Sequence, residues 1–149
     1  MKLVHYGAKV FDRKLFKEVT NKYSWMNKPG GGLWTSPIES NHSWLKWCEE
    51  NEYRTYEYDN CFYITLNDNA KILKVDSIDD LKGLPLIRNT ILEKDIIDFK
   101  ELYSVYDCVW LTEIGETNTR YTDPLGLYGW DCESVFIMNP NCFTMDNNF

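Results

Sequence analysis

KPGGGLWTSP, residues 28–37, places three consecutive glycines directly before an apolar pair, two hydroxyl side chains and a proline. Each glycine loses more conformational freedom on folding than other residues, so a plain turn rarely carries three. A hairpin connection whose tryptophan enters the core would explain the pattern. A ligand site would explain it too, because glycines let a ligand approach the backbone closely. The stretch lacks the Gly-Lys-Ser/Thr ending of a phosphate-binding P-loop.

The composition is that of an ordinary globular domain. The chain has 149 residues, of which 44% are hydrophobic and 26% charged. We therefore expect a single domain over residues 1–149. Aromatic residues are abundant at 15%, with six Trp and ten Tyr. Large aromatic side chains bury much area, and exposed ones often line ligand sites.

The net charge limits the kinds of partner that we expect, and the cysteine content indicates the cellular compartment. A formal net charge of −7 argues against nucleic acid as the main partner, because such binding depends on Lys and Arg contacts to phosphate. The five cysteines are odd in number and irregularly spaced, and only two histidines occur, so we expect reduced thiols and no metal site. The sequence shows no signal peptide and no long apolar run, so we expect a cytoplasmic protein without a membrane segment.

Hydrophobic patterning predicts strands and helices in mixed order. We predict strands at 1–8, 61–66, 71–75, 106–111 and 133–138, and helices at 13–23, 42–51, 77–84 and 95–103. Residues 113–129 are predicted to form a long loop and residues 144–149 a frayed tail. Because these elements do not alternate as regular βα units, the predicted fold class is α+β, with mixed or antiparallel sheets and short flanking helices.

Three short motifs carry side chains suited to chemistry. His5 lies on the first predicted strand, Trp34-Thr35-Ser36 follows the glycines, and Asp131 and Glu133 precede the last strand. Each motif also has a plain structural explanation. His5 would be a half-buried histidine with satisfied hydrogen bonds, Trp34 a core residue of a hairpin, and the two acids a solvated strand end.

Taken together, LVHYG, GLWTSP and WDCESVFIMNP resemble, in their order, the histidine–tyrosine–glutamate pattern of the ADP-ribosyltransferases. The resemblance implies an ADP-ribosyltransferase-like fold and an NAD-dependent enzyme. Such an enzyme transfers ADP-ribose to a protein or nucleic-acid acceptor and releases nicotinamide, with NAD as its substrate and no metal. The chain departs from the family pattern in having Trp34 where the family usually has Tyr. It also lacks, at the late acid, the E-x-E or Q-x-E pair of arginine-directed members.

The resemblance also implies a role for each matching residue. His5 would bind a ribose of NAD, and Trp34 with Thr35 or Ser36 would frame the nicotinamide. Glu133 would be the acid at the reacting ribose, with Asp131 as the other candidate.

Backbone and basic groups complete the predicted NAD site. The amides of Gly31 and Gly32 would reach the ligand. Lys28 and Arg120 are candidates for the diphosphate, and each is otherwise a solvated surface cation.

Nearly the whole chain also resembles a group of small proteins of unknown activity, many of them encoded by phages. The shared motifs are His5–Gly7, Lys28–Pro37, Trp44–Cys48 and Tyr128–Pro140. This second resemblance motivates an alternative function, a non-enzymatic interaction protein that inhibits a host factor, in which case the protein would act in the host cytosol. The acidic charge and the many tryptophans suit a protein partner. A third possibility is a transferase scaffold that binds NAD without catalysis.

Overall fold

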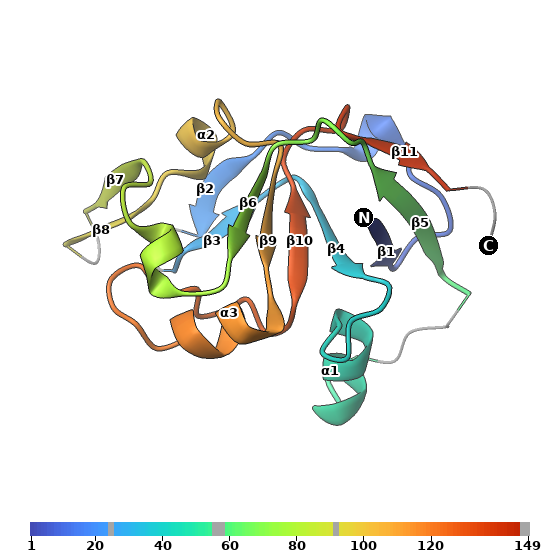
Figure 1. Ribbon diagram of the computed structural model, residues 1–149, viewed down its shortest axis with the longest axis horizontal. Coiled ribbons are helices and arrows are strands. Elements are labelled where there is room, and N and C mark those ends of the chain that lie inside the picture. Colours follow the sequence, from blue (N-terminus) through green and yellow to red (C-terminus); the bar gives the residue numbers. More distant parts are fainter. Residues whose placement is uncertain (24–25, 55–58, 91–92, 147–149) are drawn as a thin grey trace.

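A seven-stranded sheet organises the molecule in the computed structural model, which describes residues 1–23, 26–54, 59–90 and 93–146 (Figure 1). Its strands are β1 (Lys2–Tyr6), β4 (Leu33–Pro37), β5 (Cys61–Leu66), β6 (Ile72–Val75), β9 (Cys108–Leu111), β10 (Ser134–Ile137) and β11 (Phe143–Met145). Their order is β11-β5-β1-β4-β10-β9-β6. Only β6 and β9 pair in parallel; the other neighbours are antiparallel. The sheet is therefore mixed.

Two small hairpins and several short helices surround this sheet. The hairpins are β2 (Thr20–Tyr23) with β3 (Lys28–Gly30), and β7 (Leu86–Asn89) with β8 (Lys94–Ile97). The helices are α1 (Trp44–Glu50), α2 (Phe99–Leu102) and α3 (Glu113–Thr119), with 3-10 turns at Arg13–Leu15 and Ile78–Leu81. The predicted class, α+β with a mixed sheet and short helices, is confirmed. Among the described residues, no helix is long and apolar enough to cross a membrane.

Strand β4 is shared between the two halves of the sheet. Its first three residues pair with β10, so that Trp34 lies opposite Phe136. Its last two residues pair with β1 on the other side, where Ser36 lies opposite Val4. In Figure 1, β10, β9 and β6 stand on one side of β4, and β1, β5 and β11 stand on the other. Each half of the sheet therefore pairs with only part of β4. Where each pairing ends, the neighbouring strand, β10 or β1, diverges from β4.

Alternating side chains of β4 and β10 enter two separate apolar cores. Trp34 and Phe136 point to the core that also holds Trp130 and Leu111. Their chain neighbours point to the opposite core: Leu33, Val135 and Ile137, together with Leu3 and Ile64. All four residues of β10 are buried, as expected for a central strand that is covered on both faces.

The glycines before β4 are required by close packing of the chain. Gly31 has φ +71°, and a Cβ there would lie 2.0 Å from the carbonyl oxygen of Glu18. Gly32 has φ +58°, and its Cβ would lie 2.4 Å from the ring of Phe136. Both glycines therefore lie against protein atoms, and they allow β4 to start directly against the core.

Several predicted elements differ from the structure. The predicted helix 77–84 is a 3-10 turn over Ile78–Leu81. The predicted helix 13–23 is a 3-10 turn followed by β2. This strand pairs with β3, which ends at the first glycine of the stretch. The predicted helix 95–103 is divided at Asp98: its first part is β8, and Asp98 caps α2 by accepting bonds from the amides of Lys100 and Glu101. Strand pairing within a hairpin outweighed the helical pattern in the two segments that form β2 and β8.

The predicted loop 113–129 begins with a helix, α3. The hydroxyl of Thr112 caps it by accepting a bond from the amide of Gly115 at 3.0 Å. Gly115 suggested a loop, but a Cβ there would lie 2.0 Å from the carbonyl oxygen of Val75, so the glycine permits close packing of the helix. The predicted frayed tail includes the last residues of β11, and its residues 147–149 lie outside the described part of the chain.

Alanine substitutions at the glycines separate two effects on the free energy of unfolding: steric overlap with neighbouring atoms and the left-handed backbone conformation. Gly83 also has positive φ, +77°, but open space surrounds it, so Gly83→Ala is a matched control. We expect Gly83→Ala to lower the free energy of unfolding by about 1–2 kcal/mol, the cost of the left-handed conformation. Gly31→Ala and Gly32→Ala should each cost roughly 1–3 kcal/mol more, because overpacking is added. Urea unfolding of the three variants measures this difference. Equal losses in all three would contradict the packing explanation.

Candidate functional site

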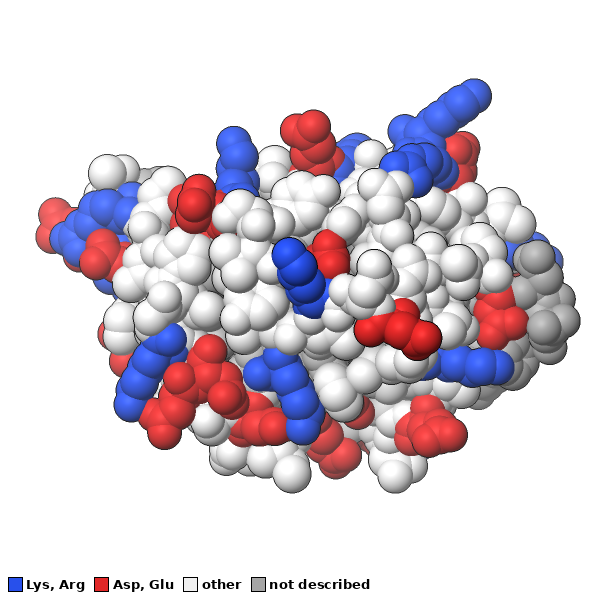
Figure 2. Space-filling model, turned by 45° about the horizontal axis from the view of Figure 1, so that its top comes forward, with Lys and Arg blue, Asp and Glu red and all other residues white. Residues whose placement is uncertain are grey.

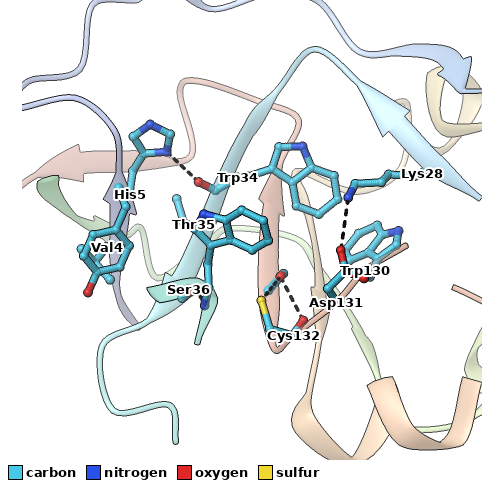
Figure 3. A pocket seen from close by; sticks show the side chains of 12 residues that line it. Val4, His5, Lys28, Trp34, Thr35, Ser36, Trp130, Asp131 and Cys132 are labelled. Atoms are coloured by element: carbon cyan, nitrogen blue, oxygen red, sulfur yellow. Dashed lines mark hydrogen bonds and ion pairs between the residues drawn. The ribbon is translucent and has the colours of Figure 1, made fainter. Parts of the chain in front are cut away.

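A cavity of about 260 Å³ lies where β4 passes from β10 to β1 (Figure 3). Its walls come from β1, β3, β4, the first residue of α1 and the segment that leads into β10. The lining residues are Val4, His5, Tyr6, Lys28, Trp34, Thr35, Ser36, Trp44, Trp130, Asp131, Cys132 and Ser134. The divergence of the strands therefore brings together residues that are far apart in the sequence.

Tryptophan rings form the apolar wall. Trp34 packs edge-on against Trp130, with ring centroids 4.6 Å apart and an angle of 71° between the planes. Trp130 is only 1% exposed, and its indole donates a hydrogen bond of 2.8 Å to the carbonyl of Asn27. Trp34 is partly buried and also packs on Phe136. The core thus fixes the ring of Trp34 while the ring still borders the cavity, so it offers a rigid aromatic surface to a ligand.

His5 bridges the gap that opens between β1 and β4. Its Nδ1 lies 2.8 Å from the carbonyl oxygen of Trp34. Burial lowers the pKa of His5, and the hydrogen bond to Trp34 opposes this only in part. The ring is therefore neutral at pH 7. Since a carbonyl can only accept, Nδ1 carries the proton and Nε2 is left as an acceptor, suited to a ligand hydroxyl.

A row of alternating charges lies at the other end of the cavity. Oδ1 of Asp131 lies 3.4 Å from Nη2 of Arg120, and Oδ2 lies 4.0 Å from Nζ of Lys28. Arg120 in turn pairs with Glu116 at 2.6 Å. Lys28 also donates a hydrogen bond to the carbonyl of Gly129. The carboxylate of Asp131 is thus held between two cations, of which Lys28 lines the cavity and Arg120 stands behind.

The three Ser and Thr hydroxyls of the cavity differ in what they can offer a ligand. Thr35 donates to the carbonyl of Val135 at 2.7 Å, and Ser134 donates to the carbonyl of Cys132 at 3.0 Å, so both hydroxyl protons are used inside the protein. The Ser36 hydroxyl oxygen accepts a bond from the amide of Trp44 at 3.1 Å. Ser36 therefore keeps its own proton to donate, and of these three hydroxyls it is the one best suited to a ligand carbonyl.

The structure brings together some of the predicted site residues and separates others. His5, Trp34, Thr35, Ser36 and Asp131 line one cavity, together with Lys28. Gly31 and Gly32 do not line this cavity, and a Cβ at either position would meet protein atoms. Arg120 reaches the cavity only through Asp131.

Glu133 lies outside this cavity. Its carboxylate accepts a hydrogen bond of 2.9 Å from the indole of Trp110, in a different hollow that Pro37 and Ile38 also line. Two residues apart in a regular strand, Asp131 and Glu133 would share a face. Residues 132 and 133 form a bend before β10, so this alternation fails and the two carboxylates point to different places.

Several lining residues were missed by the sequence analysis as site residues, among them Tyr6, Trp44, Trp130, Cys132 and Ser134. Trp130, Cys132 and Ser134 lie within the motif that contains Asp131, so the motif was the available signal. Nothing in the local pattern indicates that Trp44 reaches the cavity, because that contact depends on how α1 packs. Within the described residues, no group of three or more His, Cys, Asp or Glu side chains is arranged to hold a metal ion.

Comparisons of the chain with protein families, with curated proteins and with solved structures find no match.

Thiol labelling tests the burial of the cavity wall. Cys48, Cys108, Cys132 and Cys142 are buried, whereas Cys61 is partly exposed. Burial raises the pKa of Cys132 to about 12, and burial also raises the pKa of Cys48. We expect a disulfide reagent at pH 8 to modify one thiol per native chain and all five after unfolding in guanidinium. In Cys61→Ser the native value should fall to none. Rapid native labelling of Cys132, located by peptide mapping, would contradict the closed wall.

Proposed function

We propose that the protein is an NAD-dependent ADP-ribosyltransferase with an ADP-ribosyltransferase-like fold, and that Asp131 is its catalytic acid. The observation that carries this proposal is the convergence of a neutral histidine, a fixed tryptophan ring, a donating hydroxyl and a carboxylate in one cavity. These groups match the needs of a flat ring joined to a sugar: an aromatic surface for the ring and polar partners for the hydroxyls.

The size of the cavity suits one end of a dinucleotide. Ligand pockets typically measure roughly 300–1,000 Å³, and this cavity of about 260 Å³ is slightly smaller. The nicotinamide ring packs on Trp34, and the Ser36 hydroxyl donates to its carboxamide. The acceptor nitrogen of His5 receives a ribose hydroxyl. The remaining part of the dinucleotide then lies outside the cavity.

The chemistry is cleavage of the bond between C1′ of the ribose and the pyridinium nitrogen. Nicotinamide leaves as a neutral molecule with the bonding electron pair, and positive charge develops on the ribose as in glycoside hydrolysis. The carboxylate of Asp131 stabilises that charge and accepts a ribose hydroxyl bond. A nucleophile of the acceptor then bonds to C1′ and releases its proton. Asp131 replaces Glu133 in this role because Glu133 lies outside the cavity.

The surface supports a protein acceptor over a nucleic-acid acceptor. The net charge is −7, and on the face shown in Figure 2 basic side chains stand interspersed with acidic ones instead of forming a continuous basic stripe. Binding to nucleic acid depends on grouped Lys and Arg contacts to phosphate.

Incubation with NAD labelled in the nicotinamide ring tests the proposed function. We expect the wild-type protein to release nicotinamide, and Asp131→Asn to lower the rate by roughly 100-fold or more, the usual loss when one electrostatic stabiliser is removed. Glu133→Gln is the matched control and should stay close to the wild-type rate. Circular dichroism checks that both variants are folded. No release by the wild-type protein, or equal losses in both variants, would sink the proposal.

A specific surface feature favours the alternative function, inhibition of a host factor by binding. Tyr121 is 83% exposed and Tyr128 is 52% exposed, with their rings 6.1 Å apart. Exposed tyrosine pairs are typical anchors of protein interfaces. If binding alone is the function, a bacterial protein should co-purify with the chain, Tyr121→Ala should weaken that complex, and Asp131→Asn should leave it intact.

A further inference from the structure

Three groups that attract cations surround the ammonium group of Lys28. Its Nζ lies 5.3 Å from the ring centroid of Trp34 and 4.0 Å from the carboxylate of Asp131, and it donates to the carbonyl of Gly129. Figure 3 shows the end of the Lys28 side chain beside the Trp34 ring, with a dashed line that joins it to Asp131. An aromatic face, a carboxylate and a carbonyl oxygen are the groups that proteins use to bind organic cations.

Two of the groups that surround this cation, the Trp34 ring and the Asp131 carboxylate, are held by other contacts. Trp34 is fixed by Trp130 and Phe136, and Asp131 keeps its second cation, Arg120. Lys28, in contrast, enters the cavity on a flexible four-carbon stem, and its side chain is 30% exposed. Burial lowers the pKa of Lys28, so its ammonium gives up solvation to stay there, although Asp131 opposes the shift. The ring and the acid can therefore remain in place if the lysine moves out.

We propose that Trp34, Asp131 and the Gly129 carbonyl form a recognition site for a planar organic cation, which Lys28 occupies in cis until such a ligand displaces it. The identification of that cation as an oxidised nicotinamide ring rests on the proposed function; the site itself does not. Two consequences follow. The site distinguishes a charged ring from its neutral analogue, and Lys28 competes with the ligand.

A cation site and a phosphate contact predict opposite changes in ligand binding when Lys28 loses its charge. If Lys28 bound the diphosphate of NAD, loss of its charge would weaken binding. If Lys28 occupies the cation site, loss of its charge leaves the carboxylate and the ring available, and binding of a cationic ring becomes tighter. A single substitution therefore separates the two roles.

Calorimetric titration with two small probes tests the site. The probes are 1-methylnicotinamide, a planar cation, and nicotinamide, its neutral analogue. We expect wild-type protein to prefer the cation, and Lys28→Met to bind the cation roughly five- to tenfold more tightly, in line with the strength of cation–aromatic contacts. Binding of neutral nicotinamide should stay within about twofold, because the ring surface is unchanged. Lys94→Met is the matched control, since Lys94 pairs with exposed Asp123, and neither residue lines the cavity.

The outcomes are decisive in both directions. Weaker or unchanged binding of the cation by Lys28→Met, or equal binding of the two probes by wild-type protein, overturns the cation site. Lys28→Gln serves if Lys28→Met does not fold, and the preference of the wild-type protein needs no variant. Because no step of this test measures nicotinamide release, cation binding without NAD cleavage would uphold the site and reject the transferase.

Discussion

The sharing of β4 between β10 and β1 is the constraint on which the rest of the structure depends. Leu33, Trp34 and Thr35 pair with one strand and Ser36 and Pro37 with the other, so the neighbouring strands diverge where each pairing ends. The glycines before β4 make this possible by letting the chain enter against the Phe136 ring and the Glu18 carbonyl. The cavity lies at this divergence, which explains why its walls combine the first strand, the glycine stretch and the approach to β10.

Different parts of the cavity provide a rigid surface and the charged groups. Trp34 is fixed by the core, and the neutral His5 is fixed by its bond to the Trp34 carbonyl, so the ring surface and one acceptor are preorganised. The carboxylate of Asp131 is held by Arg120 from behind, and only Lys28 stands on the cavity side. A low-polarity wall beside a fixed carboxylate strengthens the attraction of that carboxylate for developing positive charge. The arrangement therefore fits cleavage of a glycosidic bond to a cationic ring.

Strands with a clear apolar pattern could be predicted from the sequence, and so could the α+β class. CFYITL matches β5 in full, because alternating apolar residues define a strand without tertiary information. The segments at 13–23 and 95–103 carried a helical pattern, and pairing with a neighbouring strand of a hairpin decided their structure. His5, Trp34 and Ser36 were found because they stand in short motifs. The choice between Asp131 and Glu133 depended on a bend before β10, and no local pattern reveals that bend.

The proposed function requires that this cavity binds the nicotinamide end of NAD, with Asp131 at the reacting ribose. A crystal structure of the wild-type protein, soaked with a millimolar carbocyclic analogue of NAD whose C1′–nitrogen bond is not cleaved, tests this binding mode. We expect the nicotinamide ring against Trp34, a ribose hydroxyl beside Asp131 and the side chain of Lys28 displaced from the cavity. An empty cavity, or a dinucleotide bound in the hollow beside Glu133 and Trp110, would contradict it.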